Sequence, residues 1–370
     1  MNILIAPNAF KGTLAAGEVA SLIDRVVKEL DKNVQTMLCP IADGGDGTAS
    51  LLANSLGLKQ HQSLALDAIG RPIHGFFALE GKRAFMDVST VSGIQHLHDY
   101  QLDPWLCSTF GTGQLIKEAL QKGATQFVVG LGGSATVDLG IGMLRALGYL
   151  FLDENGREIP VFSPGFLNKI AHIQSPIQKI KLQFTLLCDV NNRFFGEQGA
   201  IPVFGPQKGL LQTDATRFEQ IAEKVCKMLY QKSGKAFEDL PGFGAAGGIA
   251  LGLSAFFPVE IKMGAPWFFE QVNMIDRILE ADLVITGEGR YDAQSAGGKG
   301  SHELLNLVKK LQKNIVLITS GERGEVSDFD AVWRLPDLDL DQPDTKIRAK
   351  KNLENTVIKG FEQWLNGVKK

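Results

Sequence analysis

Apolar positions near the start of the chain switch between two spacings. Residues 3–6 form a short apolar run, and apolar residues then recur every three or four positions over residues 19–30. The first pattern predicts a buried strand and the second an amphipathic helix, because one face of a helix repeats every 3.6 residues. Residues 34–41 predict a second strand, and another helical pattern begins near Leu51. This alternation predicts a parallel sheet covered by helices.

Short strand-like segments between residues 61 and 88 follow a different pattern. Turn residues interrupt them at 69–72 and 80–82, which predicts hairpins in an antiparallel sheet. The later predicted helices are 112–123, 137–147, 215–231 and 301–311, and the later predicted strands are 127–130, 183–188, 283–286 and 315–319. The parallel arrangement is therefore resumed late in the chain.

The chain has 370 residues, which exceeds the length at which one hydrophobic core usually stops growing, so two domains are expected. No linker rich in Pro or Ser separates the two patterns, which favours insertion of one domain into the other. We predict an α/β fold in which residues 1–60 and 278–370 form a Rossmann-like parallel-sheet domain. Residues of about 61–277 form an inserted mixed α/β domain, and segment 106–150 could belong to either.

Charge and composition narrow the classes of function. The formal net charge is −3, and Lys and Arg are spread along the chain without the basic segment that nucleic-acid binding requires. The apolar runs are too short for a membrane-spanning helix or a signal peptide. Widely separated cysteines predict buried free thiols at Cys39, Cys107, Cys188 and Cys226. We therefore expect a cytoplasmic protein that binds small molecules, and neither nucleic acid nor a membrane.

A glycine-rich segment, residues 130–136, follows a predicted strand and precedes a predicted helix. Backbone N–H groups and the helix dipole at such a position favour an anion, most naturally phosphate. The candidate phosphate-binding residues are Gly132, Gly133, Ser134 and Thr136. A tight turn that needs glycine for its backbone angles explains the segment equally well.

The same segment also fits the dinucleotide fingerprint G-x-G-x-x-A, with Asp153 and Glu154 near the position of the ribose-binding acid. An NAD-dependent oxidoreductase therefore stays open as an alternative. Against it, residues 153–156 read Asp-Glu-Asn-Gly, which has the chemistry of a hairpin turn. That chemistry predicts an exposed turn for both carboxylates.

A second glycine-rich segment, residues 241–248, precedes another helical pattern. Gly244, Gly247 and Gly248 are candidates for a second phosphate cradle, although small residues that allow close helix packing account for them at least as well. The sequence contains neither G-x-x-x-x-G-K-[ST] nor the protein-kinase signature set. A kinase with this sequence must therefore use another arrangement.

Charged residues gather where predicted strands end. The acidic members are Asp43, Asp46, Asp189, Glu288 and Asp292, and the basic members are Lys11, Arg290 and Lys299. Ligands of open α/β sheets bind at such carboxyl ends. Phosphoryl transfer needs carboxylates for Mg²⁺ and for the hydroxyl proton, and cations for the charge on the moving group. The cluster indicates phosphoryl transfer, whereas any single acid could be a helix cap or a solvated turn.

Five motifs occur in the order found in bacterial type-1 glycerate kinases, a family that this chain resembles over nearly its whole length. The motifs are residues 5–12 (IAPNAFKG), 42–48 (ADGGDGT), 130–136 (GLGGSAT), 242–248 (GFGAAGG) and 286–295 (TGEGRYDAQS). Each motif is long, and their joint order is more specific than any single glycine-rich loop.

The resemblance implies two α/β domains with an active site in the cleft between them, Mg-ATP as the donor, and 2-phosphoglycerate as the product of D-glycerate. The O3 product, 3-phosphoglycerate, is less favoured, and the chain is expected to be a monomer or homodimer. By position, it implies catalytic roles for Lys11, Asp189 and Asp292, and we expect Asp189 and Asp292 also to hold Mg²⁺. We add Asp46 as a candidate Mg²⁺ ligand, and Asp43, Arg290, Ser295 and Lys299 as candidate substrate-binding residues. Which of the two catalytic aspartates is the base stays open.

The sequence departs from the family's usual pattern at three places. Asn8-Ala9 stands where Asp-Ser is common, Asp46 where Glu is common, and Val137-Asp138-Leu139 where Asn-Asp-Gly is common. Asn8 cannot serve as an anion or a base. A hydroxy-acid-binding module that keeps the site without the chemistry therefore stays open as an alternative. Retention of the three catalytic candidates argues against it, and a turnover assay separates the two.

Overall fold

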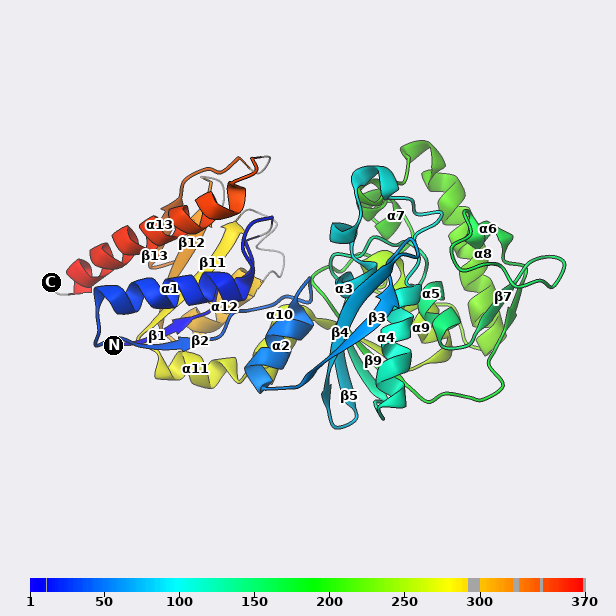
Figure 1. Cartoon of the computed structure of the whole chain (residues 1–370), viewed down its shortest axis with the longest axis horizontal. Coiled ribbons are helices and arrows are strands. Elements are labelled where there is room, and N and C mark those ends of the chain that lie inside the picture. The colour runs from blue at the N-terminus through cyan, green and yellow to red at the C-terminus, as the bar shows by residue number, and fades with distance from the viewer. Residues whose placement is uncertain (11, 292–299, 322–325, 340–341, 369–370) are drawn as a thin grey trace. The chain divides into compact units, whose positions relative to one another are not determined.

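The computed structural model describes residues 1–10, 12–291, 300–321, 326–339 and 342–368. The chain divides into two units, which are treated separately below. Unit 1 consists of Met1–Asp43 and Gly264–Lys370, and unit 2 consists of Gly44–Met263. Figure 1 shows the consequence in its colours, because the blue start and the red end of the chain share one unit.

Unit 1 is built on a five-stranded parallel sheet of order β13-β12-β11-β1-β2. Its elements are β1 (Asn2–Ile5), α1 (Ala16–Leu30), β2 (Gln35–Leu38), α10 (Gly264–Gln271), α11 (Met274–Glu280), β11 (Leu283–Arg290), α12 (Gly300–Lys310), β12 (Asn314–Ser320), β13 (Ala331–Leu335) and α13 (Thr345–Val368). Counted within the unit, the strand order is 2-1-3-4-5, which is a doubly wound arrangement. The predicted Rossmann-like parallel sheet is thereby confirmed.

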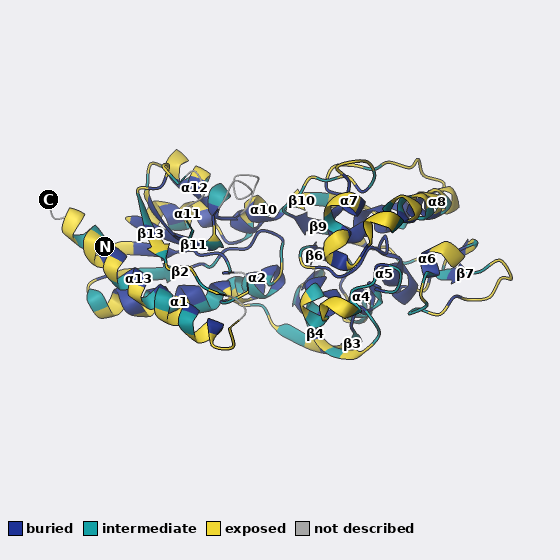
Figure 2. Ribbon diagram, turned by 90° about the horizontal axis from the view of Figure 1, so that it is seen from above, coloured by how far each residue is buried: buried dark blue, intermediate teal, exposed yellow. Residues whose placement is uncertain are grey.

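Helices cover both faces of this sheet. Figure 2 shows the sheet between α1 and α13 on one side and α11 and α12 on the other. The apolar repeat of α1 buries Val19, Ile23 and Val26 against the sheet, as the spacing predicts. Phe361 of α13 is also fully buried in this core.

Unit 2 contains a six-stranded mixed sheet of order β10-β9-β6-β5-β4-β3 and a two-stranded sheet of β7 and β8. Its strands are β3 (Gln60–Leu66), β4 (Pro72–Glu80), β5 (Arg83–Asp87), β6 (Gln126–Gly130), β7 (Leu150–Leu152), β8 (His172–Gln174), β9 (Gln183–Cys188) and β10 (Val259–Met263). Its α-helices are α2 (Thr48–Leu56), α3 (Ser89–Ser92), α4 (Phe110–Gln121), α5 (Ile141–Ala146), α6 (Phe166–Lys169), α7 (Ala200–Phe204), α8 (Ala215–Ser233) and α9 (Ile249–Phe256). Short 3₁₀ turns cover Ile94–His96, Asp99–Gln101, Pro206–Lys208, Gln212–Asp214 and Ala245–Gly247.

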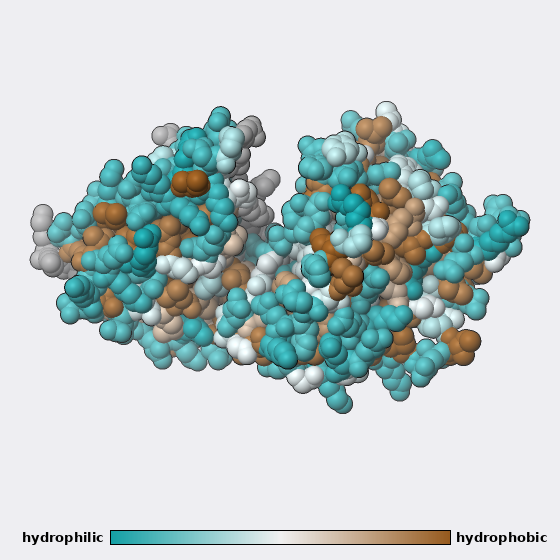
Figure 3. All heavy atoms as spheres, in the orientation of Figure 1, coloured by the Kyte–Doolittle hydropathy of each residue, from teal (hydrophilic) through white to brown (hydrophobic). Residues whose placement is uncertain are grey.

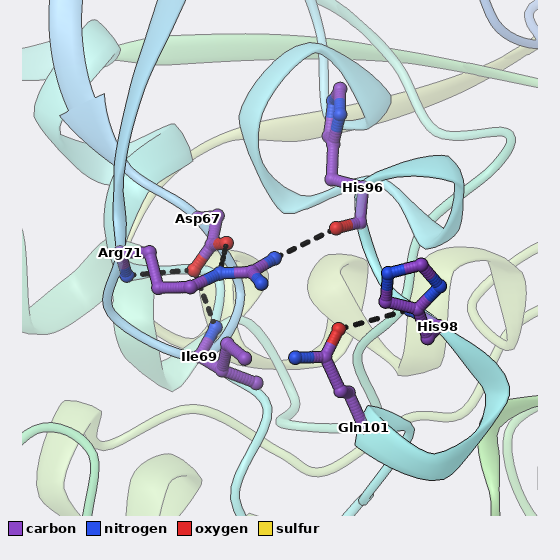
Figure 4. A network of polar contacts seen from close by, with 6 residues as sticks. All are labelled: Asp67, Ile69, Arg71, His96, His98 and Gln101. Atoms are coloured by element: carbon purple, nitrogen blue, oxygen red, sulfur yellow. Dashed lines mark hydrogen bonds and ion pairs between the residues drawn. The ribbon is translucent and has the colours of Figure 1, made fainter.

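The β3–β4 hairpin confirms the antiparallel region predicted from its turn residues. Within the turn, an oxygen of the Asp67 carboxylate accepts hydrogen bonds from the backbone N–H groups of Ile69 at 3.0 Å and Arg71 at 2.8 Å. The guanidinium of Arg71 donates to the backbone oxygen of His96 (Figure 4). The turn is thereby tied to the segment that follows α3.

The division into units falls earlier in the chain than the sequence pattern predicts. The predicted boundaries were 60 and 277, whereas the units meet at Asp43–Gly44 and at Met263–Gly264. Helix α2 packs on β4, β5 and β6 of unit 2, and α10 and α11 pack on elements of unit 1. Segment 106–150 lies entirely within unit 2.

One predicted helix, 137–147, is wrong over its first turn. Helix α5 begins only at Ile141, because Leu139 and Gly140 have φ values of 57° and 68°. Both values lie in the left-handed region, which cannot continue a right-handed helix. The glycine-rich loop that starts at Gly130 is therefore separated from the helix by several residues of irregular backbone.

Polar side chains cover most of the visible surface, and exposed apolar residues form separate small patches (Figure 3). All four cysteines are buried free thiols, as predicted. Burial raises the pKa of Cys39, Cys107 and Cys188 to about 11. Among the described residues, no helix has the length and apolar character needed to span a bilayer.

Candidate functional site

The described candidate residues fall into two groups, one in each unit. Unit 2 carries Asp46, Gly132, Gly133, Ser134, Thr136, Asp189, Gly244, Gly247 and Gly248, and unit 1 carries Asp43 and Arg290. The remaining candidates, Lys11, Asp292, Ser295 and Lys299, lie outside the described residues.

Two loops of unit 2 meet at the carboxyl ends of the neighbouring parallel strands β6 and β9. The backbone N–H of Gly132 donates to the carbonyl oxygen of Gly44 at 3.1 Å, and the N–H of Leu131 donates to that of Leu187 at 2.9 Å. A Cβ atom on Gly132 would lie 2.5 Å from the Cα atom of Gly45, closer than real Cβ atoms come to neighbours. The glycines are therefore required for the backbones of these loops to meet.

Replacing Gly132 with alanine tests this packing. The added methyl group must push the Gly45 loop away, and overpacking of this kind typically costs about 1–3 kcal/mol. We expect a lower urea unfolding midpoint and a loss of turnover, because the loop carrying Asp46 is displaced. Gly17→Ala is the control, since a Cβ atom there would meet nothing within 4 Å. Equal midpoints and turnover in the two variants would contradict the argument.

Acidic side chains line this convergence of loops. The Asp46 carboxylate accepts a hydrogen bond from the Ser89 hydroxyl at 2.6 Å. Asp87, which ends β5, is fully buried and accepts from the backbone N–H of Ala49 at 3.0 Å. Burial, and after it the nearby Asp46 charge, raises the pKa of Asp87 to about 8. Asp189 is half-buried and directly follows the end of β9. Asp46 and Asp189 therefore both lie in loops at the carboxyl ends of the strands of this sheet.

Backbone N–H groups of the loop after β6 are largely taken up by hydrogen bonds to backbone oxygens of the same unit. The N–H of Ala135 donates to the oxygen of Ser92 at 2.9 Å, and the N–H of Leu139 donates to that of Gly247 at 3.0 Å. Because α5 begins later than predicted and has only six residues, the expected helix dipole does not act on residues 130–136. Gly133, which is exposed, is the part of the loop most accessible to an anion.

Lys208 is a buried cation that the sequence analysis missed. Its ammonium group donates to the Ser134 hydroxyl at 2.8 Å and to the Thr136 carbonyl oxygen at 2.9 Å. Burial lowers the pKa of Lys208 to about 8, although the nearby Asp138 charge acts in the opposite direction. No local pattern in the sequence indicates this contact, because Ser134 and Thr136 lie 74 and 72 residues away in the chain.

Asp138 organises the irregular segment before α5. Its carboxylate accepts hydrogen bonds from the Thr109 N–H and hydroxyl, both at 2.8 Å, and from the N–H groups of Gly140 and Gly142, both at 3.1 Å. The side chain is completely buried, and burial raises its pKa. Leu139 adopts the left-handed backbone, with φ of 57°, for which glycine is better suited.

The second glycine-rich segment, residues 241–248, packs closely against other residues of unit 2. Cβ atoms at Gly244 and Gly247 would lie 2.4 Å and 2.1 Å from the carbonyl oxygens of Arg193 and Thr136. A Cβ atom at Gly248 would lie 2.8 Å from the Phe194 ring. Close packing alone accounts for glycine at all three positions, in agreement with the packing interpretation that the sequence left open.

The unit 1 candidates lie at the carboxyl ends of its strands. The amide of Asn8 donates to the Asp43 carboxylate at 3.1 Å, and its oxygen accepts from the N–H of Ala9 at 2.7 Å. The neutral amide of Asn8 thus lies against the Asp43 carboxylate without the repulsion that a second acid would bring. Arg290 is exposed at the end of β11, after a register shift that begins at Gly287.

The interpretation of residues 130–136 as a dinucleotide fingerprint predicted that the carboxylates of Asp153 and Glu154 lie beside a ribose. Asp153 and Glu154 instead lie in a turn after β7, where Asp153 accepts from the N–H groups of Asn155 and Arg157 at 2.9 Å. Residues 154–157 are exposed. The hairpin-turn prediction for this segment is confirmed.

No group of three or more His, Cys, Asp or Glu side chains within the described ranges is arranged to hold a metal ion. Mg²⁺ in phosphoryl-transfer sites is usually held by one or two carboxylates together with substrate phosphates. The carboxylate oxygens of Asp46 and Asp189 are of the kind that this chemistry uses.

Comparisons with known proteins point to one family. The model of the glycerate kinase family matches residues 3–364. A glycerate 2-kinase of Escherichia coli K12 is 35% identical over 88% of this chain and 87% of its own length. A glycerate kinase of Haemophilus influenzae is 36% identical over 90% of this chain and 88% of its own. A protein of Salmonella typhimurium LT2, whose crystal structure carries the provisional name glycerate kinase 2, matches over 100% of both chains with a TM-score of 0.84 and 29% identity.

Proposed function

Because the chain belongs to the glycerate kinase family, we propose that it transfers the γ-phosphoryl group of Mg-ATP to the O2 hydroxyl of D-glycerate, giving 2-phosphoglycerate and ADP. The observation that carries the proposal is the family match over residues 3–364, which includes all five motifs. The name glycerate 2-kinase of the Escherichia coli relative supports transfer to O2. The buried free thiols favour a reducing compartment such as the cytoplasm as the place of action.

The reaction forms one bond and breaks one. The hydroxyl oxygen of D-glycerate attacks the γ-phosphorus, the bond from that phosphorus to the β,γ-bridging oxygen breaks, and ADP leaves. The hydroxyl proton passes to a carboxylate, for which Asp189 and Asp292 are the candidates. Mg²⁺ neutralises charge on the phosphates when it is bound, and Asp46 and Asp189 are its candidate ligands among the described residues.

Positive charge is needed both for the glycerate carboxylate and for the transferring phosphoryl group. Arg290, Lys11 and Lys299 are the candidates, and the exposure of Arg290 suits contact with a ligand. Asp43 and Ser295 remain candidates for the glycerate hydroxyls. In unit 2, Gly132, Gly133 and Ser134 remain candidates for the ATP phosphates, with Lys208 holding Ser134 in place.

The position of transfer is tested by coupling the reaction to enolase, which consumes 2-phosphoglycerate. Immediate enolase signal with D-glycerate and Mg-ATP is the expected result. Signal that requires added phosphoglycerate mutase would mean transfer to O3. No glycerate-dependent ADP would favour the non-catalytic binding module.

A further inference from the structure

A cavity of about 450 Å³ in unit 1 lies at the carboxyl ends of its parallel strands. Residues after β1, the last residues of β11, and residues at or just after the ends of β12 and β13 line it, together with residues of α13. Strands β1 and β11 are neighbours in the sheet. The chain leaves β1 toward β2 on one side and returns as β11 on the other side. This is the topological switch point at which open α/β sheets bind ligands.

The lining combines apolar walls with a few polar groups, as small-molecule sites do. Its apolar members include Phe10, Leu335 and Leu338, and its polar members include Glu288, Arg290 and Asn352. Glu288 is buried, whereas Arg290 is exposed. The apolar walls suit a flat ring. The amide of Asn352 can both donate and accept a hydrogen bond, as the edge of a nucleobase requires.

We infer that this cavity holds the nucleoside part of the phosphoryl donor, with its first phosphate beside Arg290. The inference rests on the proposed kinase function. Carboxylates on the lining accept hydrogen bonds from ribose hydroxyls, as acids do in other doubly wound folds. They repel phosphates, whereas the guanidinium of Arg290 attracts them.

Glycerate fits this cavity poorly for two physical reasons. It is a three-carbon acid, and it would leave most of about 450 Å³ unfilled. It is also an anion, and among the described lining residues the two carboxylates of Glu288 and Asp337 outnumber the one guanidinium, that of Arg290. A neutral nucleoside matches the volume of the cavity and the charge of this described part of its lining.

Photolabelling with 8-azido-ATP tests the inference without any turnover. Trypsin cleavage after Arg334, Lys346, Lys351 and Lys359 gives peptides 335–346 and 352–359, which carry Leu335, Leu338 and Asn352. We expect label in one or both peptides, and we expect adenosine and ATP to protect them. Label confined to peptides of residues 44–263, or label that neither compound reduces, would overturn the inference.

Steady-state kinetics provide a second test. Asn352→Ala is expected to raise KM for ATP about tenfold, since a lost hydrogen bond of about 1.4 kcal/mol corresponds to a factor of ten. KM for D-glycerate should stay within twofold of wild type. Asn355→Ala is the matched control, because Asn355 is an exposed asparagine on α13 that does not line the cavity. An unchanged KM for ATP in Asn352→Ala, with a melting temperature equal to that of the control, would count against the inference.

The two proposals can fail separately. An active glycerate kinase without protected label in unit 1 overturns the nucleoside site and leaves the function intact. Protected label in peptides 335–346 or 352–359 of a chain without glycerate kinase activity supports the nucleoside site and overturns the proposed function.

Discussion

Asp189→Asn is expected to lower kcat by about 10²- to 10⁴-fold, the range that a positioned proton acceptor contributes. The side chain is half-buried after the end of β9, beside the loops that carry Asp46 and Gly132. Asparagine keeps the shape but can neither take the hydroxyl proton nor offer Mg²⁺ an anionic ligand. The coupled ADP assay at saturating D-glycerate and Mg-ATP measures the effect.

The control for this variant is Glu154→Gln. It also removes one carboxylate from unit 2, but the residue lies in the exposed turn after β7, so kcat should stay near the wild-type value. It further tests the dinucleotide interpretation, which gave that turn a role. The catalytic assignment of Asp189 fails if its variant keeps kcat within threefold of wild type while folding normally.

Asp138→Ala is expected to destabilise the protein by about 4 kcal/mol. The carboxylate accepts from three backbone N–H groups and from the hydroxyls of Thr109 and, at 3.5 Å, Ser108, in a completely buried position. Each donor left without a partner costs about 1–3 kcal/mol, and rearrangement of the Thr109 and Gly140 segments recovers part of that cost. Urea unfolding followed by circular dichroism measures the change.

The matched control is Asp153→Ala. Asp153 also accepts from two backbone N–H groups, but water can replace the carboxylate at this surface turn, so we expect a loss of about 1 kcal/mol or less. Similar losses in the two variants would show that Asp138 does not organise the loop. Retained stability of Asp138→Ala with lost turnover would instead give it a chemical role.

The sequence predicted those elements whose apolar periodicity reflects burial in a single sheet. The strands of residues 3–6 and 283–286 correspond to β1 and β11, the central neighbours of unit 1. Strand β10 was missed because its residues are only partly buried and it forms the edge of its sheet. The unit boundary after Asp43 was also missed, because the apolar face of α2 does not indicate which sheet it covers.

The glycine-rich segments illustrate the limit of local patterns. Their sequence fits both an anion cradle and close packing, and only three-dimensional contacts distinguish these, such as the approach of Gly247 to the Thr136 oxygen. Lys208 was missed for a related reason. Its partners Ser134 and Thr136 lie 74 and 72 residues away in the chain, so no local spacing reveals the contact.

The most direct test of the proposed function is a ³¹P NMR time course of the purified chain with Mg-ATP and D-glycerate. The account predicts that the ATP signals decline while ADP and a glycerate phosphomonoester appear in equal amounts. It also predicts no change when D-glycerate is omitted. ATP that stays intact, or that yields inorganic phosphate in place of the phosphomonoester, would contradict the assignment of this chain as a glycerate kinase.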